Sequence, residues 1–178
     1  MELETPLKDG SRLLISHADP SDAAEIVSYV NRVSGESDFL TFGPGELGIS
    51  VEGETKLIVG LDGGRFNFML KGVASRQIVA LCTLMRQPRP RLRHVGELGL
   101  SVARSHWGLG IGKSMCLAML EVAREVGVTK VDLNVREDNA SAIRLYERVG
   151  FQREGLRARG LRAGDRYFSN VTMGICLD

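Results

Sequence analysis

The chain has 178 residues, of which 43% are hydrophobic and 25% charged, and its formal net charge at pH 7 is +1. A chain of this length can bury a full core, so residues 1–178 are predicted to form a single domain. The nearly balanced charge gives no reason to expect nucleic acid or a membrane as a partner. Neither a long apolar run nor the layout of a signal peptide is present, so a soluble cytoplasmic protein is expected.

The first half of the chain predicts a strand, two helices and two further strands. The strands are expected at residues 12–17, 66–71 and 78–86. The helices are expected from the Asp19-Pro20 cap to about Val33, and from Ser50 to the glycines after Asp62. The inward-facing residues are predicted to be Ala23, Ile26, Val27 and Val30 in the first helix, and Leu57 and Ile58 in the second.

Two connectors in this half could serve a substrate. Residues 34–49 are rich in glycine, serine and acids, with Phe39, Leu40 and Phe42 interspersed. This segment is either the wall of a substrate site or a hydrophobic flap pinned to the core, and both interpretations stay open. The basic connector 88–94 could assist in binding an anion, but a solvated hairpin loop stiffened by two prolines is favoured.

A glycine-rich turn lies between the next strand and helix. Residues 97–102 predict a strand, with Glu97, Gly99 and Ser101 on one face. Glycines that let the main chain come close, followed by a helix start, form a general device for binding phosphate. The turn reads Trp107-Gly108-Leu109-Gly110-Ile111-Gly112, and Met115, Met119, Val122 and Val126 then recur at helical spacing.

Two phosphate-binding motifs fit this turn poorly. Gly112-Lys113-Ser114 imitates the end of the nucleoside-triphosphate loop, but that motif needs a glycine where the chain has Trp107. The dinucleotide motif G-x-G-x-x-G fails because the glycines are spaced as G-x-G-x-G.

A second motif follows the strand predicted at residues 130–135. Asn139 is a good N-cap, and Gly150 is a natural stop for the helix between them. Its apolar face is predicted to hold Ala142, Ile143, Leu145, Tyr146 and Val149. The stretch Asn139–Phe151 reads N-x-x-A-x-x-L-Y-x-x-x-G-F.

Together the two motifs resemble the conserved blocks of the GNAT superfamily of acyl-CoA N-acyltransferases. The pyrophosphate motif Q/R-x-x-G-x-G/A falls on residues 107–112, with Trp107 at its first position, as in branches similar to ribosomal-protein and polyamine acetyltransferases. The resemblance covers nearly the whole chain and implies an α/β (α+β) fold. Its mixed central sheet would have about seven strands with helices on both faces. The fourth and fifth strands, ending at Val102 and Val135, would be parallel and would splay apart.

The resemblance also implies roles for individual residues. Tyr146 would donate a proton or hydrogen bond to the departing sulfur of coenzyme A. Glu97 would accept the amine proton, with His94 as an alternative base. Asn139 would bind the pantetheine arm or only cap its helix. The predicted cofactor-binding residues are Leu100, Ser101, Val102, Trp107, Gly108, Leu109, Gly110, Ile111, Gly112, Lys113 and Asn139.

The cysteines and histidines are scattered without metal-like spacing, and no metal is predicted. The odd cysteine count without a secretion signal argues against a disulfide framework. Each cysteine lies in an apolar context, which favours core packing over a nucleophilic role. The three cysteines are Cys82, Cys116 and Cys176, and the three histidines are His17, His94 and His106.

The expected function is transfer of an acetyl group from acetyl-CoA to a primary amine, directly and in a ternary complex. The acceptor would be a small molecule or a protein N-terminus, and the alternative is a non-catalytic CoA-binding or sensory module. Acceptor choice is assigned to residues 34–49, the basic connector and the arginine-rich segment 157–166. That segment lies between a strand at 151–153 and a last strand at 167–177. A homodimer is left open.

Overall fold

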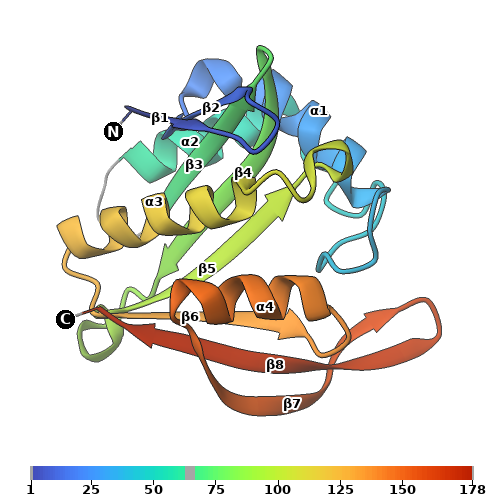
Figure 1. Cartoon of the computed structure of the whole chain (residues 1–178), viewed down its shortest axis with the longest axis vertical. Helices are drawn as coiled ribbons and strands as arrows, with labels where there is room; N and C mark the ends of the chain where they lie inside the picture. Colours follow the sequence, from blue (N-terminus) through green and yellow to red (C-terminus); the bar gives the residue numbers. More distant parts are fainter. Residues whose placement is uncertain (1, 63–66, 178) are drawn as a thin grey trace.

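The computed structural model describes residues 2–62 and 67–177, which form one mixed sheet with helices on both faces (Figure 1). Within these residues the sheet has eight strands in the order β1-β2-β3-β4-β5-β6-β8-β7. The elements are β1 Glu2–Pro6, β2 Arg12–His17, α1 Ala23–Ser34, α2 Val51–Asp62, β3 Asn67–Ala74, β4 Gln77–Arg86, β5 Val95–Val102, α3 Ile111–Glu125, β6 Lys130–Arg136, α4 Ala140–Val149, β7 Gln152–Ala163 and β8 Arg166–Cys176.

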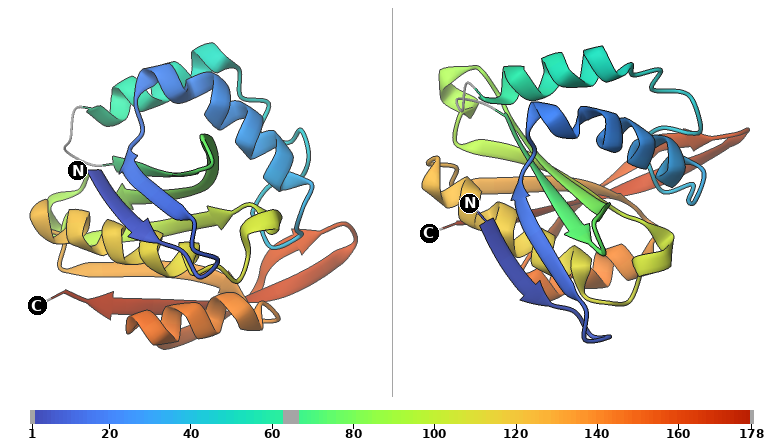
Figure 2. Two further views of the ribbon diagram at one scale, coloured as in Figure 1. Left: turned by 45° about the horizontal axis from the view of Figure 1, so that its top comes forward. Right: turned by 90° about the horizontal axis from the view of Figure 1, so that it is seen from above.

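The helices divide into two pairs, one on each face of the sheet (Figure 2). Helices α3 and α4 cover the main core, in which Met115 and Met119 of α3 pack with Leu133 of β6. Helices α1 and α2 cover a second core around Ile78 and Leu81 of β4. The apolar residues of α3 recur every three or four positions, so one side of this helix is buried, as the sequence predicts.

The sheet opens between β5 and β6. These strands are parallel, and they pair only where Val95–Glu97 lies beside Lys130–Asp132. Beyond that point β5 remains paired with β4, and β6 remains paired with β8 through Arg136. The carboxyl ends of β5 and β6 therefore diverge, which confirms the predicted splay. With β1 counted, they are the fifth and sixth strands of the chain.

Two strands differ from the sequence prediction. Strand β1 was not predicted, because Glu2–Pro6 is a short, largely exposed edge strand with no apolar alternation. Strand β7 continues to Ala163 instead of ending at Arg153, and it pairs with β8 through two register shifts. Bulges of this kind interrupt the regular pattern that sequence reading depends on. The predicted start of β3 at residue 66 lies outside the described residues.

The inward faces of α1 and α2 also differ in detail. Tyr29 is buried at 1% exposure, whereas Val27 and Val30 are only partly buried. On α2, Ile58 is buried as predicted, but Leu57 is 45% exposed. The residue that shares the buried face of α2 with Ile58 is Glu54, one helical turn earlier.

Candidate functional site

The glycine-rich turn before α3 depends on two left-handed glycines. Gly108 and Gly110 have φ angles of 80° and 96°, a conformation that strains any residue with a side chain. A Cβ atom added at either position would meet no heavy atom within 4 Å. The turn therefore leaves open space next to its main chain.

The start of α3 presents unpaired main-chain donors to this space. The first hydrogen bond within the helix joins the Ser114 N–H to the Gly110 carbonyl at 3.2 Å. The N–H groups of Ile111, Gly112 and Lys113 precede that bond and have no partner within the helix. Such a helix start attracts anions. Gly112 serves packing, since a Cβ there would lie 3.0 Å from Leu145 of α4.

Trp107 fastens the turn to the end of β5. Its indole N–H donates to the Val102 carbonyl at 2.7 Å, while half of the side chain remains exposed. The guanidinium of Arg104 lies 5.9 Å from the centre of the indole ring. The Val102 carbonyl, predicted to pair with pantetheine, therefore already has a partner within the chain.

A line of polar side chains crosses the splay on the face that α1 covers. The side-chain amide nitrogen of Asn134 donates to the Glu97 carboxylate at 3.3 Å, and the Thr172 hydroxyl donates to the side-chain oxygen Oδ1 of Asn134 at 3.0 Å. Further along β5, the Ser101 hydroxyl lies 3.0 Å from the Tyr29 hydroxyl. Burial raises the pKa of Tyr29 to about 12, so this phenol is neutral.

Tyr146 approaches from the opposite face, on α4. It is 8% exposed, and its ring meets the edge of Phe151 at a centroid distance of 5.7 Å. Burial raises the pKa of Tyr146 well above its usual value, and the neighbouring thiols of Cys116 and Cys82 act in the same direction. This tyrosine is therefore a hydrogen-bond donor at every pH at which the protein would work.

The cysteines only partly follow their prediction. Cys82 and Cys116 are buried, and burial raises the pKa of both thiols, that of Cys116 to about 12. Thiols with such pKa values are poor nucleophiles. Cys176, at the end of β8, is exposed, so its predicted place in the core is wrong. It lies in the last residues of a strand whose faces alternate between core and solvent.

Asn139 caps α4, since its side-chain oxygen accepts the Ala142 N–H at 3.1 Å. Its side-chain nitrogen is not used in that bond. At the other end of the helix Gly150 has a φ of 115°, which confirms the predicted left-handed stop.

The basic connector and His94 lie away from the glycine-rich turn. They join β4 to the amino end of β5, whereas the turn follows its carboxyl end. Ser101 lies seven positions after His94 along the strand, or roughly 23 Å away. The connector forms an exposed 3-10 turn at Pro90–Leu92, which confirms the preference for a solvated hairpin loop.

A cavity of about 320 Å³ lies at the carboxyl ends of the splayed strands. Residues 35–39 form one side, and Arg104, Trp107 and Arg136 the other; we call it the mouth cavity. In Figure 1 the loop between α1 and α2 and the tip of the β7–β8 hairpin project on the same side of the molecule.

Arg136, at the end of β6, ties the walls of the mouth cavity together. This side chain is buried and donates to both carboxylate oxygens of Asp138, at 2.6 and 2.9 Å, and to the Asp38 carbonyl at 2.9 Å. Its guanidinium lies 4.5 Å from the ring centre of Phe39 and 3.8 Å from that of Phe168. The segment 34–49 is thus both a cavity wall and a flap pinned by an aromatic side chain.

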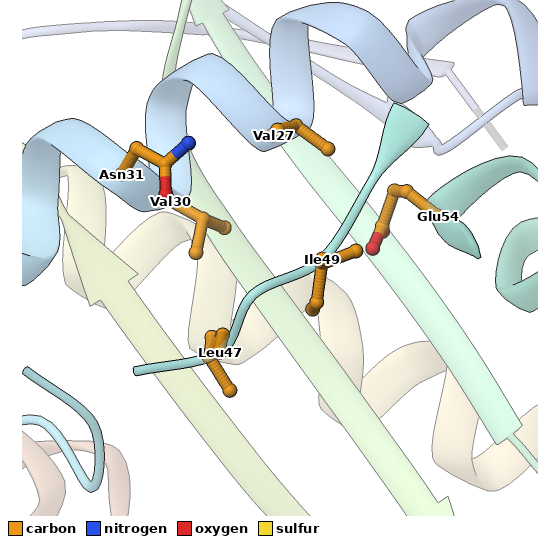
Figure 3. Close-up of a pocket in the computed structure, with 6 residues that line it drawn as sticks. All are labelled: Val27, Val30, Asn31, Leu47, Ile49 and Glu54. Atoms are coloured by element: carbon orange, nitrogen blue, oxygen red, sulfur yellow. The ribbon is translucent and has the colours of Figure 1, made fainter. Parts of the chain in front are cut away.

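A second cavity, between α1, the following loop and α2, is much smaller (Figure 3). Its volume is about 10 Å³, which is room for about one water molecule. Val27 and Val30 line it from α1, Leu47 and Ile49 from the loop, and Glu54 from α2. It cannot hold a substrate.

Sequence reading missed several residues of this site. Tyr29 and Asn134 were seen only as parts of a helix and a strand, and Arg104 and Arg136 only as residues that follow a predicted strand. None of them belongs to either motif. Their roles depend on contacts between segments far apart in the chain, and no local spacing reports such contacts.

The fold is that of the acyl-CoA N-acyltransferases. The chain belongs to the acetyltransferase (GNAT) family, whose model matches residues 53–151, and so to the N-acetyltransferases that use acetyl-CoA as acyl donor. The predicted family, fold class and donor are thereby confirmed.

Individual relatives agree with this membership. The chain is 32% identical over 90 residues (49% of its length and 56% of the relative's) to the L-amino acid N-acetyltransferase AaaT of Escherichia coli. It is 46% identical over 63 residues (35% and 38%) to the N-alpha-acetyltransferase RimI of Mycobacterium tuberculosis. The matched stretch thus spans about half or less of these relatives. A GNAT acetyltransferase structure from Streptococcus pneumoniae superposes with a TM-score of 0.89 and 28% identity, over 93% of this chain and 99% of that one.

None of the helices in the described part of the chain is long and apolar enough to cross a membrane.

Proposed function

We propose that residues 1–178 act as one catalytic domain that transfers the acetyl group of acetyl-CoA directly to a primary amine. The acceptor is a small molecule or a peptide N-terminus, held with the donor in a ternary complex. The observation that carries the proposal is the splay of β5 and β6 beyond Glu97. The unpaired N–H groups of α3 and the side chain of Tyr146 would serve one face of this opening, and Glu97 the other.

The donor would bind by main-chain contacts. The N–H groups at residues 108–113 take the pyrophosphate, with Lys113 adding charge at the helix start. Pantetheine lies along the free edge of β5 at Leu100–Val102, as an added strand would. Because Val102 already accepts the Trp107 indole N–H, Leu100 and Ser101 carry more of this pairing. The side-chain nitrogen of Asn139, which the capping bond does not use, would donate a hydrogen bond to the pantetheine arm.

In the reaction the neutral amine attacks the thioester carbonyl, a C–N bond forms and the C–S bond breaks. Glu97 takes the proton that the amine loses, directly or through water. Tyr146 donates a hydrogen bond to the departing sulfur. Its raised pKa keeps the hydroxyl protonated, so it stabilises the thiolate without itself becoming an anion.

The test follows release of free thiol from acetyl-CoA with a panel of primary amines. We expect turnover, and we expect Tyr146→Phe to lower kcat about 100-fold or more while acetyl-CoA still binds. The matched control is Tyr167→Phe, on a tyrosine that is 56% exposed on β8. Tight binding of CoA without turnover on any amine would favour a non-catalytic sensory module. Equal losses in the two variants would overturn the role of Tyr146.

A further inference from the structure

The mouth cavity contains two arginines, and only one of them has its charge neutralised. Arg136 is paired with Asp138 and enclosed by aromatic rings. The guanidinium of Arg104 has no carboxylate oxygen within 4.0 Å among residues 2–62 and 67–177, and its described neighbour is the Trp107 ring. An arginine in a cavity without a counter-charge can bind an anion.

The nearest acid in the cavity does not fill this role. One oxygen of Glu36 accepts the main-chain N–H of Arg104 at 2.7 Å, and the other lies 4.0 Å from the Arg32 guanidinium. Glu36 therefore holds the backbone of Arg104 in place and directs its own charge toward α1. The Asp38 carboxylate is exposed, and Asp38 contacts Arg136 through its carbonyl.

The backbone that carries Arg104 is well anchored. The Ala103 N–H donates to the Val79 carbonyl at 2.9 Å, and the Trp107 N–H donates to the Arg104 carbonyl at 3.2 Å. Trp107 is in turn fixed to Val102. Arg104 thus lies on an ordered turn two residues beyond β5 and lines a space whose volume suits a small molecule.

We propose that Arg104 binds a carboxylate of the acceptor, so that the enzyme selects amino acids over amines without an acid group. The inference rests on the proposed function and narrows its substrate class. Guanidinium and carboxylate match in a two-pronged geometry, which gives orientation as well as affinity. The carboxylate in the mouth cavity would direct the amine into the splay. Glu97 lies five positions of strand, or roughly 16 Å, before Val102, so the amine proton would reach it through water.

The experiment compares kcat/KM for an amino acid and for the corresponding amino acid amide, in wild type and in Arg104→Gln. The two acceptors differ in amine basicity, but this difference is the same for both enzymes and cancels in the double ratio. We expect Arg104→Gln to reduce the preference for the acid about 10- to 100-fold, the range of a hydrogen bond to a charged group. Activity on the amide and KM for acetyl-CoA stay unchanged. Arg104→Lys restores part of the preference, and Arg12→Gln, whose side chain is exposed on β2, leaves it intact.

The chain has a single tryptophan, so Trp107 fluorescence reports binding at this place without turnover. We expect the amino acid, but not its amide, to change the emission in the presence of CoA, and Arg104→Gln to abolish that change. If no amine is acetylated, the proposed function fails, and this titration still decides the carboxylate site. Turnover without a preference for the acid overturns the inference alone. If Arg104→Gln raises KM for acetyl-CoA and leaves the preference for the acid intact, the inference is wrong. Arg104 would then contact the phosphates of the donor.

Discussion

The side-chain amide of Asn134 on β6 donates a hydrogen bond of 3.3 Å to the carboxylate of Glu97 on β5, at the point where the two strands separate. The last main-chain pairing joins Glu97 to Asp132, two residues before Asn134. The side-chain bond thus continues the contact between the strands where the main chain no longer does. It also orients the carboxylate that we propose as the base.

Glu97→Gln keeps the size of the side chain and removes its basicity. We expect kcat on amines to fall about 10²- to 10⁴-fold, the usual contribution of a positioned base, with little change in acetyl-CoA affinity. The loss should shrink as pH rises, because more of the acceptor amine is then already neutral. Steady-state rates from pH 6 to 10 check this.

Asn134→Ala tests the orientation of Glu97 separately. The carboxylate remains, so we expect a smaller loss in kcat, on the order of tenfold, the effect of one hydrogen bond to a charged group. Thr172→Val is the matched control. It removes only the hydrogen bond from Thr172 to Asn134 and leaves the bond from Asn134 to Glu97 in place. A loss in Asn134→Ala as large as that in Glu97→Gln would mean that Asn134 contacts the substrate itself.

A substitution at a left-handed glycine of the glycine-rich turn should weaken the binding of the acyl donor selectively. Gly110→Ala forces alanine into a φ of 96°, which costs about 1 kcal/mol or more and moves the N–H groups at the start of α3. We expect the Kd for CoA to rise tenfold or more, as calorimetry would measure. Gly127→Ala, at the other end of α3 with a φ of 75°, carries a similar strain but should bind CoA normally. Equal weakening in both variants would contradict the assignment.

Sequence reading predicted the parts of this molecule that depend on local patterns. The cap at Asn139 and the left-handed stop at Gly150 were predicted because each is decided by a few neighbouring residues. The predicted cap at Asp19 is also present, but it begins a 3-10 turn at Pro20–Asp22 that leads into α1. The two motifs gave the family for the same reason, since each lies within one short stretch. The parallel pairing of β5 and β6 also followed, because a helix crosses between them, and the splay came with the family resemblance.

The features that sequence reading did not predict depend on contacts between segments that lie far apart in the chain. Strand β1 has the composition of a loop, and it is a strand because β2 offers it an edge. Strand β7 bends through bulges against β8, so its apolar period is lost. The mouth cavity brings together residues 35–39, 104 and 136, whose distance along the chain hides their proximity.

Replacing Arg136 should affect both the stability of the fold and the binding of the acceptor. Arg136→Met retains a long side chain between Phe39 and Phe168 but loses the bonds to Asp138 and to the Asp38 carbonyl. We expect a loss of about 1–3 kcal/mol in unfolding free energy and a several-fold higher KM for the acceptor, with KM for acetyl-CoA unchanged. Chemical denaturation and steady-state kinetics measure the two effects.

The stability loss in Arg136→Met should depend on pH. The hydrogen bonds from Arg136 hold the pKa of Asp138 below its usual value, so this pair stabilises the fold above the ordinary pKa of an aspartate. That contribution disappears as pH falls through the lowered pKa. The difference between wild type and variant should therefore narrow in acid. A constant difference from pH 7 to pH 3 would show that lost packing, and not lost charge pairing, causes it.

The buried carboxyl group of Glu54 should make the stability of the fold depend on pH in the opposite direction. Its side chain is 4% exposed and lies beside Val27, Val30 and Ile49 (Figure 3), and burial raises the pKa of its carboxyl. When the folded-state pKa is raised, the native state binds the proton more tightly than the unfolded state does. Stability is then greatest at low pH and falls as pH rises from the unfolded pKa through the folded one.

Glu54→Gln removes this charge while keeping the shape of the side chain. We expect the variant to melt at a higher temperature than wild type at pH 7, and the gap to close toward about pH 3, where Glu54 is protonated in both the folded and the unfolded chain. Glu52→Gln, whose side chain is 78% exposed on the same helix, is the control and should leave Tm nearly unchanged. If Glu54→Gln lowers Tm at pH 7, the carboxylate is stabilised in the fold by a partner, and desolvation does not dominate its energetics.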